Sequence, residues 1–583
     1  MARKGKIKGK LDPFTREVIR NGLVAAAEEM FYSLGRTAKS PIIYEVLDYA
    51  CGITDKDGRL IAQANGVPGF LGTLTYQVQE VLQKFGVAQL SSGDVFIANV
   101  PYSGGGTHLS DVSLVQPIFY KKRLVGFSVN KGHWTEVGGK DPGSWTTDSI
   151  EIHQEGTMFP CIRIFEKGTE IPSVVDLIRA NSRLPDETIG DMRAQAASLT
   201  VAANRVVRLC EKYGIDVILW AIQEILEWGE RITLNQLRRL PRGTYESEEY
   251  LDTYGIQEKP VKVKAKVTIT DRDITFDFSG TEGQIRGPVN CPTPAALSAI
   301  RTMMLAITDP HVHANEGCFA PMKVKIPEGT VISATKPFPT STFWEGMSYA
   351  QDVVWKSLAP LVPDKLTAGH FLSVCATIVG GVHDETGATW LIVEPEAGGW
   401  GAGANKDGES GLVCSGDGET YIMPVEIQET RYPILVEQFS LNTADGGYGK
   451  NRGGFGLIRD YKIMNSNGFV TSIFGRSRFP PWGMAGGADG TGNFIEVMPK
   501  SGKAFRTDRV ARHPLERGDV VRLITGAGGG FGNPMERDPE KVLDDVRNGC
   551  IAVTQAREKY GVIVDPNSMT VDSEKTSKLR KRL

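Results

Sequence analysis

The segment at residues 93–112 reads GDVFIANVPYSGGGTHLSDV, and it combines a strand, a tight turn and two side chains that can bind a metal. The apolar run Val95–Ala98 is typical of a short buried strand. The glycines at 104–106 let the backbone fold tightly, because glycine adopts conformations that other residues avoid. We therefore expect His108 and Asp111 to be aimed in one direction directly after this turn.

A second histidine and a further carboxylate extend this pattern. His133, in VNKGHWTEVGG, follows a predicted strand at 124–130. Neutral imidazole and carboxylate groups together suit zinc, manganese or iron, so His108, Asp111 and His133 are predicted ligands of one divalent ion. Glu45 is acidic in the otherwise apolar stretch SPIIYEVLD, and burying a carboxylate is costly unless it is paired or bound to a metal. From spacing alone, the alternative to metal binding is that these histidines lie at the surface or make structural hydrogen bonds.

Other familiar site motifs are weak or missing. His311 and His313 could chelate an ion from one face of a strand, but their proline and polar neighbours favour a loop. No Gly-Lys pair is followed by Ser or Thr, and no G-x-S-x-G segment occurs. The segment at 399–404 matches G-x-G-x-x-A, but a helix is not expected after it, which argues against dinucleotide binding.

The hydrophobic pattern of the whole chain predicts an α+β fold class. We expect a multidomain protein with mixed sheets, an αα-hairpin near 188–239 and a glycine-rich, loop-heavy β region toward the C-terminus. The predicted parts are an N-terminal α/β region with the metal site (1–245), a central α+β domain (246–390), a glycine-rich β domain (391–537), and a C-terminal helix with a basic tail (538–583). Other predicted elements are a helix from Asp12 that buries Phe14, Val18, Leu23, Ala26, Ala27 and Met30, a hairpin at 46–63, strands at 261–279, helices at 292–306 and 345–359, and a helix near 538–560.

Composition excludes several classes of function. The 66 Lys+Arg and 69 Asp+Glu residues give a net charge of −3, which offers no attraction to nucleic acid or a membrane surface. No apolar run is long enough to span a bilayer, and no signal peptide is visible. The eight cysteines include no C-x-x-C pair, so a reduced, cytoplasmic protein is expected. The short basic segments at the two ends are expected to be solvated and disordered.

Several segments of the chain, taken together, resemble the hydantoinase B/oxoprolinase family over about residues 11–540. The matching segments are DPFTREVIRNGLVAAAEEM (12–30), GDVFIANVPYSGGGTHLSDV (93–112), GHWTEVGG (132–139), PGS (142–144), DFSGTEGQIRGPVN (277–290), GGWGAGANKDGESG (398–411), RYPILVEQFSLNTADGGYGKNRGGFG (431–456) and GAGGGFGNP (526–534). The main glycine clusters of the chain fall in these segments. The resemblance implies one subunit of an ATP-dependent enzyme, paired with a larger hydantoinase A-type subunit that binds ATP and Mg²⁺ and phosphorylates the substrate, in a heterotetramer or larger complex.

The resemblance also implies roles for particular residues. In the carboxylase branch of the family, a glutamate, a His-x-x-Asp pair and a further histidine hold a divalent metal, and these positions fall on Glu45, His108, Asp111 and His133. Two positions depart from the family pattern. Phe70 stands where members often have a histidine, which suggests a place in the substrate pocket. Glu136 replaces an aspartate three residues after His133, where it could act as a general base; a structural carboxylate is the alternative.

Three functions from different classes follow from these expectations. The first is the metal-binding catalytic subunit of an ATP-dependent hydrolase that opens a small cyclic amide, such as a hydantoin, oxoproline or a lactam. The second is a subunit of an ATP-dependent ketone carboxylase of the acetophenone or acetone type. The third is a non-catalytic scaffold within such a complex. Metal content separates the third from the other two, and a requirement for bicarbonate separates the first from the second.

Overall fold

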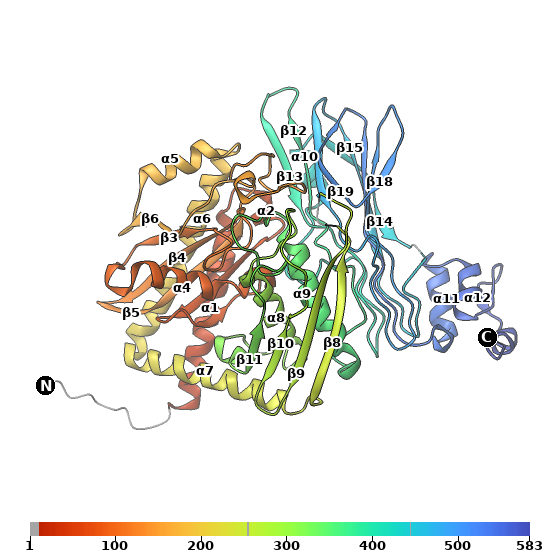
Figure 1. Cartoon of the computed structure of the whole chain (residues 1–583), viewed down its shortest axis with the longest axis horizontal. Coiled ribbons are helices and arrows are strands. Elements are labelled where there is room, and N and C mark those ends of the chain that lie inside the picture. Colours follow the sequence, from red (N-terminus) through yellow and green to blue (C-terminus); the bar gives the residue numbers. More distant parts are fainter. Residues whose placement is uncertain (1–10, 254–255, 444, 583) are drawn as a thin grey trace.

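The computed structural model describes residues 11–253, 256–443 and 445–582 (Figure 1). The N-terminal region lies on the left of this view, the central strands below the middle, and the C-terminal sheets at the upper right. The predicted α+β multidomain fold with mixed sheets is confirmed. Within the described ranges, no helix is both long and apolar enough to cross a membrane. The basic residues at the N-terminus lie outside the described residues.

The N-terminal region is built on a seven-stranded antiparallel sheet with the strand order β2-β1-β5-β4-β3-β6-β7. Its strands are β1 (Tyr49–Asp55), β2 (Leu60–Gln63), β3 (Val95–Ala98), β4 (Asp111–Tyr120), β5 (Arg123–His133), β6 (Ile162–Glu166) and β7 (Thr169–Glu170). Its helices are α1 (Pro13–Thr37), α2 (Pro41–Tyr44), α3 (Pro68–Leu71), α4 (Leu74–Phe85), α5 (Pro172–Asn181), α6 (Pro185–Tyr213) and α7 (Ile215–Leu237). The hairpin predicted at 46–63 is confirmed as β1 and β2.

The two long helices predicted near 188–239 are confirmed as α6 and α7, joined at Gly214. The apolar stripe of α6 is buried, and its most extensive helix contact is with α1. The predicted apolar face of α1 is only partly correct, because Phe14 and Val18 are exposed. Burial begins one residue later, at Ile19.

The central region places helix α9 (Phe343–Leu358) against a four-stranded sheet with the order β11-β10-β9-β8, and helix α8 (Thr293–Ile307) packs on α9. Its elements are β8 (Gly243–Leu251), β9 (Val261–Ile269), β10 (Ile274–Asp277), α8 (Thr293–Ile307), β11 (Met322–Lys325) and α9 (Phe343–Leu358). The alternation predicted for 261–269 is confirmed, because every second residue of β9 is buried. Strands β10 and β11 run parallel while the other pairs are antiparallel, so the sheet is mixed.

The C-terminal region contains two antiparallel sheets, ordered β13-β12-β16-β19 and β14-β15-β20-β17-β18. Its elements are β12 (Thr377–Val382), β13 (Thr389–Glu394), α10 (Val425–Arg431), β14 (Ile434–Asn442), β15 (Gly456–Ile463), β16 (Gly468–Ile473), β17 (Phe494–Met498), β18 (Phe505–Thr507), β19 (Arg509–Leu515) and β20 (Val520–Ile524). The predicted boundary at 390/391 falls inside β13. One buried hydrophobic cluster runs from Ile19 to Leu523, so the first three predicted parts share a core.

Glycine clusters in the C-terminal region allow backbone segments to touch. The amide nitrogen of Gly454 donates to Trp400 O at 2.8 Å, and that of Gly528 donates to Gly454 O at 3.0 Å. A Cβ atom on Gly453 would lie 1.9 Å from Gly528 O, a distance no side chain can accept. The excess of glycine therefore reflects close chain-to-chain contact in stacked loops.

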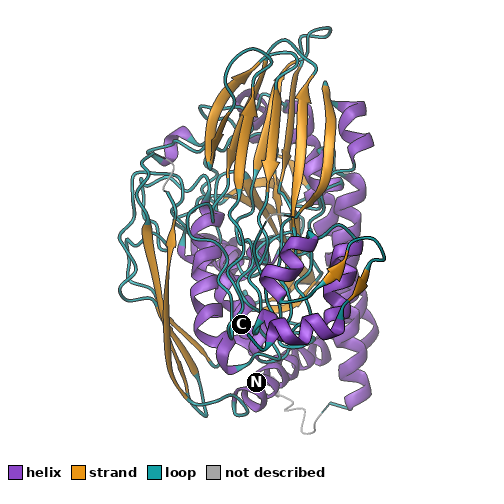
Figure 2. Cartoon of the chain, turned by 90° about the vertical axis from the view of Figure 1, so that its right-hand side faces the viewer, coloured by secondary structure: helices purple, strands orange, loops and turns teal. Residues whose placement is uncertain are grey.

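The last part of the chain differs from its prediction. The helix expected near 538–560 is two helices, because Gly549 adopts φ +70° between them. The expected basic tail folds into a short hairpin and a helix as far as it is described. The elements are α11 (Pro539–Arg547), α12 (Val553–Tyr560), β21 (Val564–Asp565), β22 (Thr570–Val571) and α13 (Ser573–Arg580). They enclose a separate small hydrophobic cluster, and the C-terminus lies on the face shown in Figure 2.

Candidate metal centre

Two neighbouring strands and the turn before them bring three predicted ligands together. Asp111 begins β4, His133 ends β5, and the two residues face each other in the antiparallel register. His108 lies in the turn that leads into β4. One ligand atom from each of His108, Asp111 and His133 lies within 4.8 Å of the others, and all three side chains are buried. The structure therefore brings together three of the four predicted ligands.

The predicted role of the glycine turn is visible in its contacts. A Cβ atom on Gly106 would lie 2.0 Å from Val100 O, and one on Gly105 would lie 2.4 Å from Thr73 O. No residue with a side chain fits either position. The turn therefore folds back on its own strand and delivers His108 to the start of β4.

Hydrogen bonds orient this group for metal binding. His108 Nδ1 lies 3.0 Å from Ser341 O, which leaves Nε2 directed at Asp111 Oδ1, 3.0 Å away. Thr107 Oγ1 donates to the other Asp111 oxygen at 2.6 Å. Histidine ligands of metals commonly have such a carbonyl partner on the second ring nitrogen. Burial would raise the pKa of Asp111, but His108, His133 and Lys131 together outweigh this effect and lower it, which favours the ionised carboxylate.

The protonation state of His133 also favours metal binding. Burial, together with the neighbouring His108, lowers the pKa of His133 to about 3, so its imidazole is neutral at physiological pH. Its Nδ1 atom is buried and has no hydrogen-bond partner among the described residues. A neutral imidazole with an unused nitrogen is the form that ligates a divalent metal. The donor set of two imidazoles and a carboxylate fits zinc, manganese or iron.

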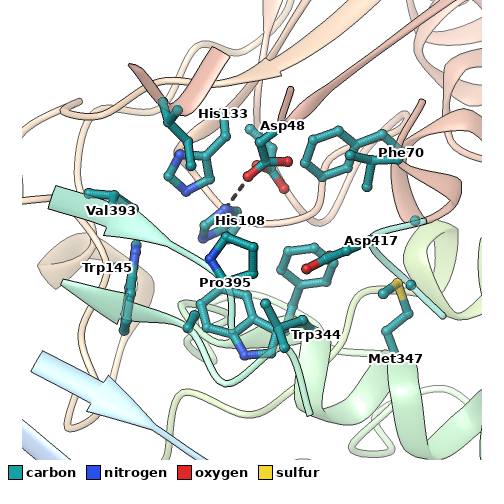
Figure 3. Close-up of a pocket in the computed structure, with 18 of the residues that line it drawn as sticks. Asp48, Phe70, His108, His133, Trp145, Trp344, Met347, Val393, Pro395 and Asp417 are labelled. Atoms are coloured by element: carbon teal, nitrogen blue, oxygen red, sulfur yellow. Dashed lines mark ion pairs between the residues drawn. The ribbon is translucent and has the colours of Figure 1, made fainter. Parts of the chain in front are cut away.

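The three ligands open into a cavity of about 50 Å³ at the meeting point of the N-terminal, central and C-terminal regions. Figure 3 shows His133, His108 and Asp48 on one side of this pocket, with Trp344 and Met347 on the opposite side. Phe70 lines the pocket as expected from its place in α3. The volume is sufficient for a few water molecules or the reacting end of a small ligand.

Two aspartates of the pocket were not identified from the sequence. Asp48 lies between α2 and β1 and lines the pocket beside Asp111. Burial and the charge of Asp111 raise the pKa of Asp48 and raise that of Asp417 to about 7. Asp417 comes from a loop of the C-terminal region, far along the chain, and no local pattern marks it. Asp48 could have been considered, because it is three residues from the predicted Glu45.

Two predicted residues lie elsewhere. Glu45 is the C-cap of α2, is half-buried, and lines neither the pocket nor the three-ligand group. The carboxylate of Glu136 is buried and accepts hydrogen bonds from the backbone nitrogens of Gly138 and Gly143 and from Ser144 Oγ. It also pairs with Arg183 at 3.1 Å. Glu136 thus holds the loop after β5 and does not line the pocket, and its role as a base stays a prediction.

The apolar side of the pocket is fixed by a buried carboxyl group. Glu345, in the first turn of α9, accepts a hydrogen bond from Ser373 Oγ at 2.6 Å. Ser373 Oγ also accepts from the backbone nitrogens of Cys375 and Gly475. This contact ties α9 to the segment that carries the pocket residue Val374. Burial raises the pKa of Glu345 to about 8.

This shift predicts a pH-dependent contribution to stability. The folded state holds the Glu345 proton more tightly than the unfolded chain, so stability is complete at low pH and is lost as pH rises toward 8. Glu345→Gln keeps an acceptor for Ser373 and removes the titration. Between pH 5.5 and 8, we expect the stability of this variant relative to wild type to increase by up to about 1.4 kcal/mol per pH unit, measured by chemical unfolding. The exposed Glu426→Gln serves as control. If the difference in unfolding free energy from wild type is equally independent of pH for both variants, the prediction is wrong.

Comparisons with known proteins cover almost the entire chain. The family model described as hydantoinase B/oxoprolinase matches residues 12–534. A putative D-/L-hydantoinase subunit from Pseudomonas sp. (strain NS671) is 31% identical over 98% of both chains. The crystal structure of the ATP-dependent caprolactamase from Pseudomonas jessenii superimposes with a TM-score of 0.89 at 26% identity, covering 98% of this chain and 100% of that one. A nucleotide-free acetone carboxylase structure gives a TM-score of 0.90 at 20% identity over 98% of this chain and 83% of that one, a likeness of fold.

Proposed function

We propose that this chain, which belongs to the hydantoinase B/oxoprolinase family, is the metal-binding catalytic subunit of a two-component, ATP-dependent enzyme that opens cyclic amides. The observation that carries the proposal is the convergence of His108, Asp111 and His133 in a buried pocket. The likeness to an ATP-dependent caprolactamase over the whole chain supports the reaction type. The hydantoinase relative is named as one subunit of its enzyme, which supports a partner subunit here.

The proposed work is divided between two subunits. A cyclic amide resists water at neutral pH, and transfer of a phosphoryl group from ATP to its oxygen would create a leaving group. We assign that step to a larger hydantoinase A-type partner that uses ATP and Mg²⁺, in a heterotetramer or larger assembly. The present chain would then bind the activated ring, and addition of water to its carbon would break the ring C–N bond while a proton is transferred to the nitrogen. The acyl phosphate so formed would be hydrolysed by a second water molecule to a carboxylate and inorganic phosphate.

We propose that Asp48 joins His108, Asp111 and His133 as the fourth ligand, in place of Glu45. Asp48 lines the same pocket and its carboxylate interacts electrostatically with Asp111. A divalent ion held by these side chains would lower the pKa of a water molecule toward 7, and this is the chemistry it would supply. Asp417, across the pocket, is placed to accept a proton from that water and return it to the ring nitrogen.

The ligand assignment predicts a contrast between two nearby acidic residues. Asp48→Asn is expected to weaken metal binding by at least tenfold, because an amide oxygen is a poorer ligand than a carboxylate. Glu45→Gln is expected to bind metal like wild type, because its side chain is outside the pocket. Metal content after dialysis against a graded chelator series measures both. The reverse order would restore Glu45 as the ligand.

The proposed function is tested with the chain co-expressed with its large partner. Purified complex is expected to hydrolyse ATP and release ring-opened product when given hydantoins or lactams, without bicarbonate. ATP turnover that requires a ketone together with bicarbonate would instead identify a carboxylase. A complex that contains no metal and loses no activity when His108 is replaced would identify a scaffold subunit.

A further inference from the structure

The pocket next to the candidate ligands has a wall of large apolar side chains. Phe343 and Trp344, from the first turn of α9, lie with their ring centroids 5.2 and 5.6 Å from that of His108. Trp145 packs edge-to-face on Trp344 at 5.3 Å, and Phe70 lines the pocket from α3. A ligand that reaches the metal ligands therefore contacts aromatic and aliphatic surface directly beside them (Figure 3).

Among the described residues that line this pocket, the carboxyl side chains are Asp48, Asp111, Glu394 and Asp417, and none is a lysine or arginine. Two buried cations contact residues of the pocket lining, and both are already engaged by other groups. Lys131 Nζ donates to Thr73 Oγ1 at 2.8 Å and to Gly105 O, and it lies over the Phe70 ring.

The second buried cation, Arg459, is also engaged. It forms ion pairs with Glu396 and, at 2.9 Å, with the pocket residue Glu394. One anionic group of a ligand can face the metal-binding side of the pocket. A second anionic group would meet carboxyl groups, apolar surface and the unpaired indole nitrogen of Trp344, with no cation among the described lining residues to balance its charge, and an unpaired buried charge is costly.

We infer that the substrate is a cyclic amide whose ring substituent is uncharged and apolar, aromatic or branched aliphatic, and that rings carrying a carboxylate, such as 5-oxoproline, are rejected. This inference rests on the proposed function and narrows it. Phe70 is the specificity-determining residue, because its ring both lines the pocket and covers Lys131. Removal of the Phe70 ring makes the apolar wall smaller and leaves the candidate metal ligands in place.

The test compares two substituents on one ring, using the intact two-subunit complex. We expect kcat/KM for 5-benzylhydantoin to exceed that for hydantoin-5-acetic acid by at least about 100-fold, which corresponds to about 2.7 kcal/mol. Without ATP, calorimetric titration of the complex should detect binding of 5-benzylhydantoin. The pair 2-pyrrolidinone and 5-oxoproline repeats the comparison on a lactam ring.

A variant tests the part played by Phe70. Phe70→Leu is expected to reduce the preference for 5-benzylhydantoin over 5-methylhydantoin about fivefold to tenfold, both in kcat/KM and in binding, because aromatic contact is lost. It should leave hydantoin-5-acetic acid excluded. Phe14→Leu, at an exposed site on α1, is the matched control and should leave both preferences unchanged.

The outcomes separate this inference from the proposed function. Ring opening in which hydantoin-5-acetic acid or 5-oxoproline matches its uncharged counterpart would overturn the inference and leave the proposed function standing. An unchanged benzyl-to-methyl preference in a folded Phe70→Leu variant would overturn the assignment to Phe70. A complex that opens none of these rings would overturn both the proposed function and the inference.

Discussion

Replacing His108 with alanine is expected to abolish stoichiometric metal binding and to lower ring-opening activity on the order of 10³-fold, because the metal supplies several kcal/mol of transition-state stabilisation. His108 is the ligand whose ring is fixed on both sides, by Ser341 O and by Asp111. Its loss therefore removes a proposed ligand and one of the two described side chains that contact the Asp111 carboxylate. Metal analysis of the purified complex and steady-state kinetics measure the two effects.

The protein should remain folded, since the substitution removes one ring beside an existing cavity. His311→Ala is the matched control, because this histidine lies exposed in the loop after α8 and outside the three-ligand group. Both variants should give the same circular dichroism spectrum as wild type. Full metal content and full activity in His108→Ala would show that the metal is bound elsewhere and that this site is not catalytic.

The part of the candidate site that could be predicted is the part built from one short segment. His108, Asp111 and His133 lie within one hairpin and the turn before it, so sequence spacing and strand ends were sufficient to place them together. Asp48 was missed in favour of Glu45 because Leu47 between them adopts φ +62°. A left-handed residue is not part of the periodic pattern of a helix or a strand, so the sequence did not predict this turn. The turn determines which acidic residue reaches the pocket.

The fold shows the same division between local and distant information. The alternation of β9 and the stripe of α6 were readable because each follows the period of its own element. Asp417 and the apolar wall of α9 enter the pocket through contacts between regions far apart in sequence. The domain boundary expected at 390/391 falls inside β13, because the hairpin of β12 and β13 joins β16 from later in the chain.

A buried ion-pair network fastens the central region to the C-terminal region, and Arg476 lies at its centre. Its guanidinium is fully buried, contacts Asp352 of α9, and lies 3.1 Å from Glu249 of β8. It also lies over the ring of Tyr349. Burial would lower the pKa of Arg476, but Asp352 and its other neighbours outweigh this and raise it, so the charge is retained.

Arg476→Met is expected to destabilise the folded chain by about 3–5 kcal/mol, because a buried ion pair broken on one side leaves an unpaired charge. Asp352 is the residue left unpaired, since it is fully buried and its other contact is the Trp482 indole nitrogen at 3.2 Å. The backbone adds no further cost, because methionine at φ +65° is no more strained there than arginine. Chemical unfolding of the purified chain measures the change.

Two further variants distinguish a lost ion pair from lost packing. Arg506→Met removes an exposed arginine 2.6 Å from Glu496 and is expected to cost less than about 1 kcal/mol, as exposed pairs contribute little. Adding Asp352→Asn to Arg476→Met should recover part of the loss, because the stranded charge is then absent. If the double variant is less stable than Arg476→Met alone, lost packing of the arginine stem over Tyr349 accounts for the effect. Recovery would instead show that the unpaired charge of Asp352 is what makes Arg476 necessary.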